Sequence, residues 1–189
     1  IEDADDILAL NSYIELSGYY LPKLTLNSAG AQAYSGAPMA CSAFVATGSA
    51  TKDGKVVMAH NFWWDYLMGS RWRVILDIRP EGGHHLMMDA CPGFIESGTD
   101  WAINDAGLGL CETTISGFVG FDENGVPEFQ RMRKAIQYGE SLGEMVRIFK
   151  EGNNGGYANA WLMADTKSGE IGKLELGLKN VNFTSTKDG

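Results

Sequence analysis

A thiol, an imidazole, an amide and a carboxylate occur close together in this sequence, at Cys41, His60, Asn61 and Asp65. A thiol becomes a strong nucleophile when a neighbouring base takes its proton. Free cysteines are also among the most buried residue types, so Cys41 could equally be a structural thiol in the core. The chemistry therefore depends on whether the fold brings these side chains together.

A β-hairpin is the element expected to do this. Apolar stretches at 41–50 and 55–61 flank the dipeptide Asp53-Gly54, and Asp-Gly between such runs is a strong hairpin signal. A hairpin returns its far end to its beginning. We therefore expect Cys41, at the start of the first strand, to lie beside the polar residues that end the second.

The rest of the chain predicts an α+β fold. Residues 1–17 should form a helix capped by Gly18, since apolar residues recur at helical spacing behind an acidic first turn. Ser141 and Glu144 form a capping-box pattern. The remaining expected elements are strands at 72–79, 84–90, 94–103, 108–114, 157–165 and 170–176, and helices at 128–138 and from 142 onward.

Composition excludes some classes of function. The chain of 189 residues has a formal net charge of −9 and is 44% hydrophobic, which suits one globular domain. It has no basic cluster, so nucleic-acid binding is not expected. It also has no apolar run near the ~20 residues that span a bilayer. We expect the sequence to be part of a longer chain.

The spacing of the metal-binding residue types predicts no metal or other cofactor. The three cysteines, Cys41, Cys91 and Cys111, form no zinc pattern. A disulfide between Cys91 and Cys111 would leave Cys41 free, but the sequence leaves that pairing open. His84 and His85 are adjacent, and neighbouring residues of a strand point to opposite faces.

Five motifs in one order carry a resemblance to a known family. They are Cys41-Ser42-Ala43, Thr51-Lys52-Asp53-Gly54-Lys55, His60-Asn61-Phe62-Trp63, Asn104-Asp105-Ala106-Gly107-Leu108 and the stretch Asn159 to Asp165. In this order they resemble the N-terminal-nucleophile (Ntn) hydrolases of the acyl-transferase peptidase group. The resemblance is greatest to the phospholipase B-like, or lamina-ancestor, branch.

This resemblance implies a four-layer αββα sandwich, of which the chain would hold an incomplete portion. It also implies self-cleavage of the Ala40–Cys41 bond. Residues 1–40 would then be a helix and pro-segment, and 41–189 the hydrolase domain. A further arginine of the family would fall beyond Gly189, in a segment with which this chain would associate.

Cleavage would make Cys41 a chain terminus that carries both a thiol and an α-amino group. Such an amine titrates at roughly 7.7–8.0, so it can take the thiol proton near neutral pH. The resemblance implies that Asn159 donates to the oxyanion. The competing interpretation of Asn159 is an asparagine that satisfies a strand end.

Two residues could orient the freed amine of Cys41. His60 matches the histidine of the phospholipase B-like branch. Asp65 resembles the aspartate of the Asn-Trp-Asp motif in the related acyl-transferase branch, although this chain has one extra residue before it. Each has a structural alternative, as a buried histidine or a turn-forming carboxylate. We expect the substrate pocket to be lined by Asn61, Trp63, Glu112 and Thr113.

The function expected is hydrolysis of a linear N-acyl amide through a thioester at Cys41. The alternatives are a phospholipase B-like lipid ester deacylase and a non-catalytic binding protein on the same scaffold. The partner would be a small acyl amide or lipid, not a nucleic acid. The resemblance favours a secreted, periplasmic or lysosomal protein.

Overall fold

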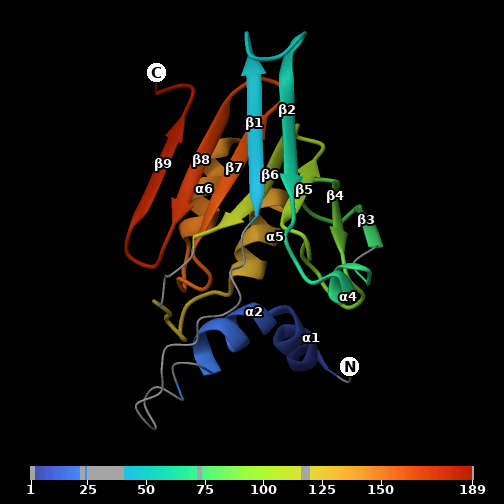
Figure 1. The fold of residues 1–189 in the computed structure, drawn as a ribbon, viewed down its shortest axis with the longest axis vertical. Coiled ribbons are helices and arrows are strands. Elements are labelled where there is room, and N and C mark those ends of the chain that lie inside the picture. Colours follow the sequence, from blue (N-terminus) through green and yellow to red (C-terminus); the bar gives the residue numbers. More distant parts are fainter. Residues whose placement is uncertain (1–2, 22–23, 25–40, 72–73, 116–119, 189) are drawn as a thin grey trace.

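A seven-stranded antiparallel sheet forms the centre of the molecule (Figure 1). The computed structural model describes residues 3–21, 24, 41–71, 74–115 and 120–188. Neighbours in the sheet follow chain order, as expected for strands joined mostly by short turns. The strands are β3 (Val74–Ile78), β4 (Leu86–Ala90), β5 (Trp101–Asn104), β6 (Leu108–Thr114), β7 (Asn159–Asp165), β8 (Ile171–Leu176) and β9 (Val181–Ser185).

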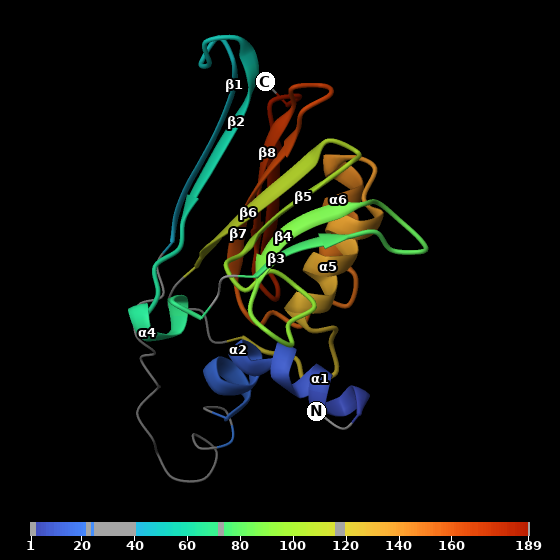
Figure 2. The same ribbon diagram turned by 90° about the vertical axis from the view of Figure 1, so that its right-hand side faces the viewer.

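Two helices between β6 and β7 cover one face of this sheet (Figure 2). Helix α5 (Glu128–Tyr138) begins directly after Pro127, and α6 (Leu142–Lys150) begins at the Ser141 cap. Their apolar faces form the core against the sheet, where the rings of Phe149 and Trp161 lie 4.7 Å apart. Both helices confirm the sequence prediction.

The predicted hairpin is present and lies on the opposite face of the sheet from the helices (Figure 2). Strands β1 (Ser42–Gly48) and β2 (Gly54–Asn61) pair so that Ser42 lies opposite Asn61 and Ala43 opposite His60. Gly54 has a φ of 74°, which glycine adopts without strain. The hairpin contacts β6 and β7, so the start of β1 lies next to the central sheet.

The N-terminal segment differs from the single helix that we predicted. It consists of α1 (Ala4–Asn11), α2 (Tyr13–Glu15) and a π-helical turn, η1 (Leu16–Tyr20). The predicted cap at Gly18 is wrong, because that residue lies inside η1. At the end of α1 the Asn11 side chain bonds to another segment, donating to the Gly93 carbonyl and accepting from the Ile95 amide.

Three other local predictions need correction. Only Trp101–Asn104 of the expected strand at 94–103 is a strand, and 91–100 is a loop. Strand β9 was not anticipated, although it pairs with β8 along its length. In the capping box, Ser141 accepts from the Glu144 amide as expected, but the Glu144 carboxylate accepts from the Glu140 amide rather than that of Ser141.

The α+β class with two antiparallel sheets is confirmed. The described residues form one layer of helices, the seven-stranded sheet and the two-stranded hairpin, which are three consecutive layers of the expected sandwich (Figure 2). Within the described part of the chain, no helix has the length and apolar character needed to cross a membrane.

Replacing Phe149 tests the packing of α6 on the sheet. The side chain is fully buried, so Phe149→Ala should lower the free energy of unfolding by about 3–5 kcal/mol through lost burial and the resulting cavity. Phe44, which is 54% exposed, provides the matched control, and Phe44→Ala should cost far less. Urea unfolding followed by circular dichroism measures both, and equal losses would contradict this packing.

Candidate active site

Cys41 lies immediately before β1, at the end of the hairpin that rests against the central sheet. Its thiol accepts a hydrogen bond from the backbone amide of Trp63, which follows β2. The sequence prediction that the hairpin returns its far end to Cys41 is therefore confirmed. The thiol lines a cavity of about 10 Å³, room for roughly one water molecule.

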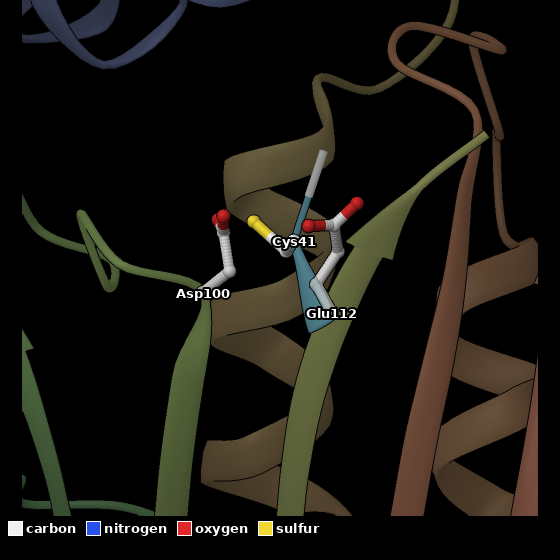
Figure 3. A group of neighbouring side chains, drawn as sticks. All are labelled: Cys41, Asp100 and Glu112. Atoms are coloured by element: carbon white, nitrogen blue, oxygen red, sulfur yellow. The ribbon is translucent and has the colours of Figure 1, made fainter. Parts of the chain in front are cut away.

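Two carboxyl groups lie next to the thiol. The Cys41 sulfur and one oxygen each of Asp100 and Glu112 all lie within 4.8 Å of one another. Figure 3 shows the sulfur between the two carboxyl groups, with Asp100 just before β5 and Glu112 on β6. Glu112 is fully buried, and its carboxyl group lies close enough to the Asp100 carboxyl and the Thr114 hydroxyl for hydrogen bonding.

The pKa values of Cys41, Asp100 and Glu112 are all raised. Burial, followed by the charges of Asp100 and Glu128, raises the pKa of Glu112 well above its usual range. Burial raises the pKa of Asp100 to about 7, although a hydrogen bond donated by the Tyr157 hydroxyl to the carboxylate acts in the opposite direction. Burial and the two nearby carboxyls raise the pKa of the Cys41 thiol to about 11. In the intact chain the thiol is therefore protonated near neutral pH.

Asp100 is the residue of this site that sequence reasoning missed. It ends the irregular loop 91–100, which is held by hydrogen bonds from the Ser97 and Thr99 hydroxyls to Asp89. Asp100 has a φ of 61°, in the left-handed region that few non-glycine residues adopt. Such backbone strain often occurs at functional sites, but no motif in the sequence signals it.

His60 lies on β2, two residues before Phe62, and its ring hydrogen-bonds to the backbone carbonyl of Glu112. Burial lowers the pKa of the imidazole, which favours the neutral ring. The Nε2 atom is buried with no hydrogen-bond partner among the described residues. His60 thus joins the hairpin to β6 beside the carboxyl pair.

Asp65 comes directly before the next helix of the chain. It is exposed and accepts a hydrogen bond from the Leu67 amide at the start of α4 (Tyr66–Gly69). Asn61 is exposed at the end of β2, opposite Ser42. The Trp63 side chain is 62% exposed but lines the same cavity as Cys41.

Asn159 begins β7 and is fully buried, and both its side-chain oxygen and nitrogen lack a hydrogen-bond partner among the described residues. Strand pairing places it opposite Thr114, which lines the cavity with Cys41. An amide buried without partners is costly, so a ligand is the reasonable candidate for its missing hydrogen bonds. Thr113 lies opposite Ala160 and is partly buried.

None of the three cysteines forms a disulfide in the structure, so the Cys91–Cys111 pairing that the sequence left open is not present. Cys111 is buried, and burial raises the pKa of its thiol to about 12. Ala40, the residue before the proposed cleavage point, lies outside the described residues. A thiol and two carboxyls at the spacing of Cys41, Asp100 and Glu112 are also ligand types that zinc accepts.

The solved structures that this chain resembles include two crystal structures of conjugated bile acid hydrolase from Clostridium perfringens. One is of a mutant in which a cysteine is replaced by alanine, and it matches with a TM-score of 0.49 and 12% sequence identity, over 80% of this chain and 52% of that one. The other is of a variant in which an arginine is replaced by leucine, and it matches with the same score and identity, over 78% of this chain and 52% of the other.

Two curated proteins show sequence similarity. An uncharacterized protein of Archaeoglobus fulgidus is 26% identical over 150 residues, which is 77% of this chain and 24% of that protein. Human phospholipase B-like 1 is 30% identical over 121 residues, 59% of this chain and 22% of that protein. The chain thus spans about a quarter of the length of these relatives.

A family model described as Phospholipase B matches residues 2–177, which is most of the chain. The sequence similarity to human phospholipase B-like 1 agrees with this match. The chain belongs to the phospholipase B family.

Proposed function

We propose that the protein is an N-terminal-nucleophile hydrolase in which Cys41, once freed from Ala40, cleaves a linear N-acyl amide bond. The observation that carries the proposal is the position of the Cys41 thiol between two buried or partly buried carboxyl groups, Asp100 and Glu112. Membership of the phospholipase B family supports a hydrolase.

Among the described side chains, no cation acts on the carboxyl pair of Asp100 and Glu112. The buried cation Arg131 acts on Glu128 and Glu15, and it donates to the backbone carbonyls of Val126 and Phe149. An ammonium group at Cys41 would lie close to both Asp100 and Glu112. Since opposite charges stabilise each other most strongly where water is excluded, this pair is suited to hold the freed amine.

Cleavage and turnover then use the same atoms. The Cys41 sulfur attacks the Ala40 carbonyl, the Cys41 nitrogen leaves with the thiol proton, and water hydrolyses the resulting thioester. In turnover the free amine takes the thiol proton, the sulfur attacks the substrate acyl carbon, and the proton passes to the departing amine. Water then hydrolyses the acyl thioester and releases the acid.

Asn159 fits the role of oxyanion donor. Its side-chain amide is buried, has no hydrogen-bond partner among the described residues, and belongs to the strand next to Thr114. A donor that is fixed before the reaction costs no reorganisation when the oxyanion forms. The Trp63 backbone amide, which already donates to the sulfur, lies close enough to Cys41 to be the second donor.

An ester substrate is the alternative, and the family description and the name of the human relative favour it. The same thiol would attack a phospholipid ester, and the exposed Trp63 beside the cavity could cover an acyl chain. A panel of N-acyl amino acids, bile-salt conjugates and phospholipids would separate amide from ester cleavage. A chain that hydrolyses none of them would favour a binding protein.

Removing the thiol should abolish both reactions. We expect Cys41→Ala to remain uncleaved and to lose turnover, while Cys91→Ala, which removes another partly buried thiol, retains both. Gel mobility reports the cleavage, and hydrolysis of the best panel substrate reports turnover. Retained turnover in Cys41→Ala would exclude Cys41 as the nucleophile.

Removing the amide of Asn159 should slow the chemical step. Asn159→Ala should lower kcat by roughly 10²–10³, the usual loss of one oxyanion donor, with a smaller change in KM. Asn182, an exposed asparagine on β9, gives the control variant Asn182→Ala with unchanged kcat. Single-turnover kinetics measure the step, and an unchanged kcat in folded Asn159→Ala refutes this role.

The buried carboxyls also predict how stability depends on pH in the intact chain. The pKa is raised to about 7 at Asp100 and about 8 at Glu128, so folding binds protons that the unfolded chain releases near pH 4. Their contribution to the free energy of unfolding should therefore be complete below about pH 4 and fall as the pH rises to about 8.

Urea unfolding of the Cys41→Ala chain at several pH values measures this dependence. Glu112→Gln should reduce the loss by removing another carboxyl group whose pKa folding raises, whereas Glu81→Gln, at an exposed site, should not. Stability that rises with pH across this range would contradict the charge state described here. Greatest stability in acid would suit the lysosomal location that we propose as one possibility.

A further inference from the structure

One buried carboxyl of this region has no role in the proposed reaction. Glu96 is only 7% exposed and lines the same cavity as Cys41 and Asp100. Burial and the negative charges of Glu128, Asp100 and nearby acids raise the pKa of Glu96 well above its usual range. Burial and these charges set the direction of the shift, and no hydrogen bond from a described residue is among its causes.

Two other acids of this region are better satisfied. Asp89 accepts hydrogen bonds from the Ser97 and Thr99 hydroxyls, and Glu15 accepts from the Glu128 amide and the Asn154 side chain. These groups therefore need no further partner. Glu96 differs, because the charged groups that act on it within the described chain are all acids.

The freed amine of Cys41 cannot satisfy every carboxyl at the site. It brings one positive charge, and Asp100 and Glu112, which approach the sulfur within 4.8 Å, are the groups placed to share it. Glu96 is then left either protonated or in need of a second cation. A buried, unpaired carboxylate is expensive, so the site favours a ligand that brings that charge.

The other walls of the cavity suit a cation. Aromatic side chains line it beside the carboxyls, including Tyr13, Phe94 and Trp64. Aromatic faces attract ammonium groups. The space of about 10 Å³ holds roughly one group the size of a water molecule, which suits a primary ammonium better than a trimethylammonium.

We infer that Glu96, with the aromatic walls beside it, binds a primary ammonium group of the substrate next to the Cys41 thiol. This inference rests on the proposed function only in treating the cavity as the substrate site. It names the substrate class as acyl compounds that carry a primary amine near the scissile bond.

Binding can be measured without turnover. Thermal unfolding of the full chain with increasing ethylammonium chloride, at ionic strength held constant with sodium chloride, gives the apparent Kd. Ethanol is the neutral probe of similar size, and tetramethylammonium is the bulkier cation. Ethylammonium should raise the Tm, and neither control probe should do so.

Glu96→Gln should weaken ethylammonium binding by about tenfold or more, the usual loss of a hydrogen bond to a charged group. Glu81→Gln, at an exposed glutamate, should bind as the parent chain does. Equal binding by both variants would overturn the inference. Equal effects of ethylammonium, ethanol and tetramethylammonium on the Tm of the parent chain would also overturn it. This comparison does not depend on the folding of Glu96→Gln.

The result separates this inference from the proposed function. A chain that binds ethylammonium through Glu96 but stays uncleaved and inactive refutes the proposed function alone. A cleaved, active chain in which Glu96→Gln binds ethylammonium unchanged refutes the inference alone.

Discussion

The crowding of buried carboxyl groups around the Cys41 thiol is the constraint on which the account of this protein depends. Asp100 and Glu112 lie within 4.8 Å of the sulfur and of each other through their nearest atoms, and both have raised pKa values. Within the described part of the intact chain, protons are what neutralise them. The site is therefore arranged for a cation, and an amine released at Cys41 would appear where the cation is needed.

The fold keeps these acids in place by bringing three separate elements together. The hairpin returns Trp63 to Cys41, β6 supplies Glu112 from the central sheet, and the loop before β5 supplies Asp100. That loop is also tied to the N-terminal segment by Asn11. Helices α5 and α6 fix the sheet from its other face, so the charged groups lie at the end of a rigid scaffold.

Much of this arrangement could be predicted because its signals are local. Asp53-Gly54 specifies the hairpin, and helical periodicity specifies α5 and α6. Asp100 could not be predicted, since its position depends on hydrogen bonds within an irregular loop and on a strained backbone angle. Asp65 shows the opposite case: its carboxylate accepts the amide of Leu67, two residues on, at the start of α4, which is the turn-forming role that the sequence also allowed. Local sequence does not encode the long-range contacts that place Asp100.

The N-terminal residue of the mature, active polypeptide tests the central claim most directly. Intact-mass measurement and N-terminal sequencing of the protein purified in active form would identify it. The account predicts a polypeptide that begins with Cys41, whose amine and thiol are both free. An active chain in which the Ala40–Cys41 bond is intact would contradict it.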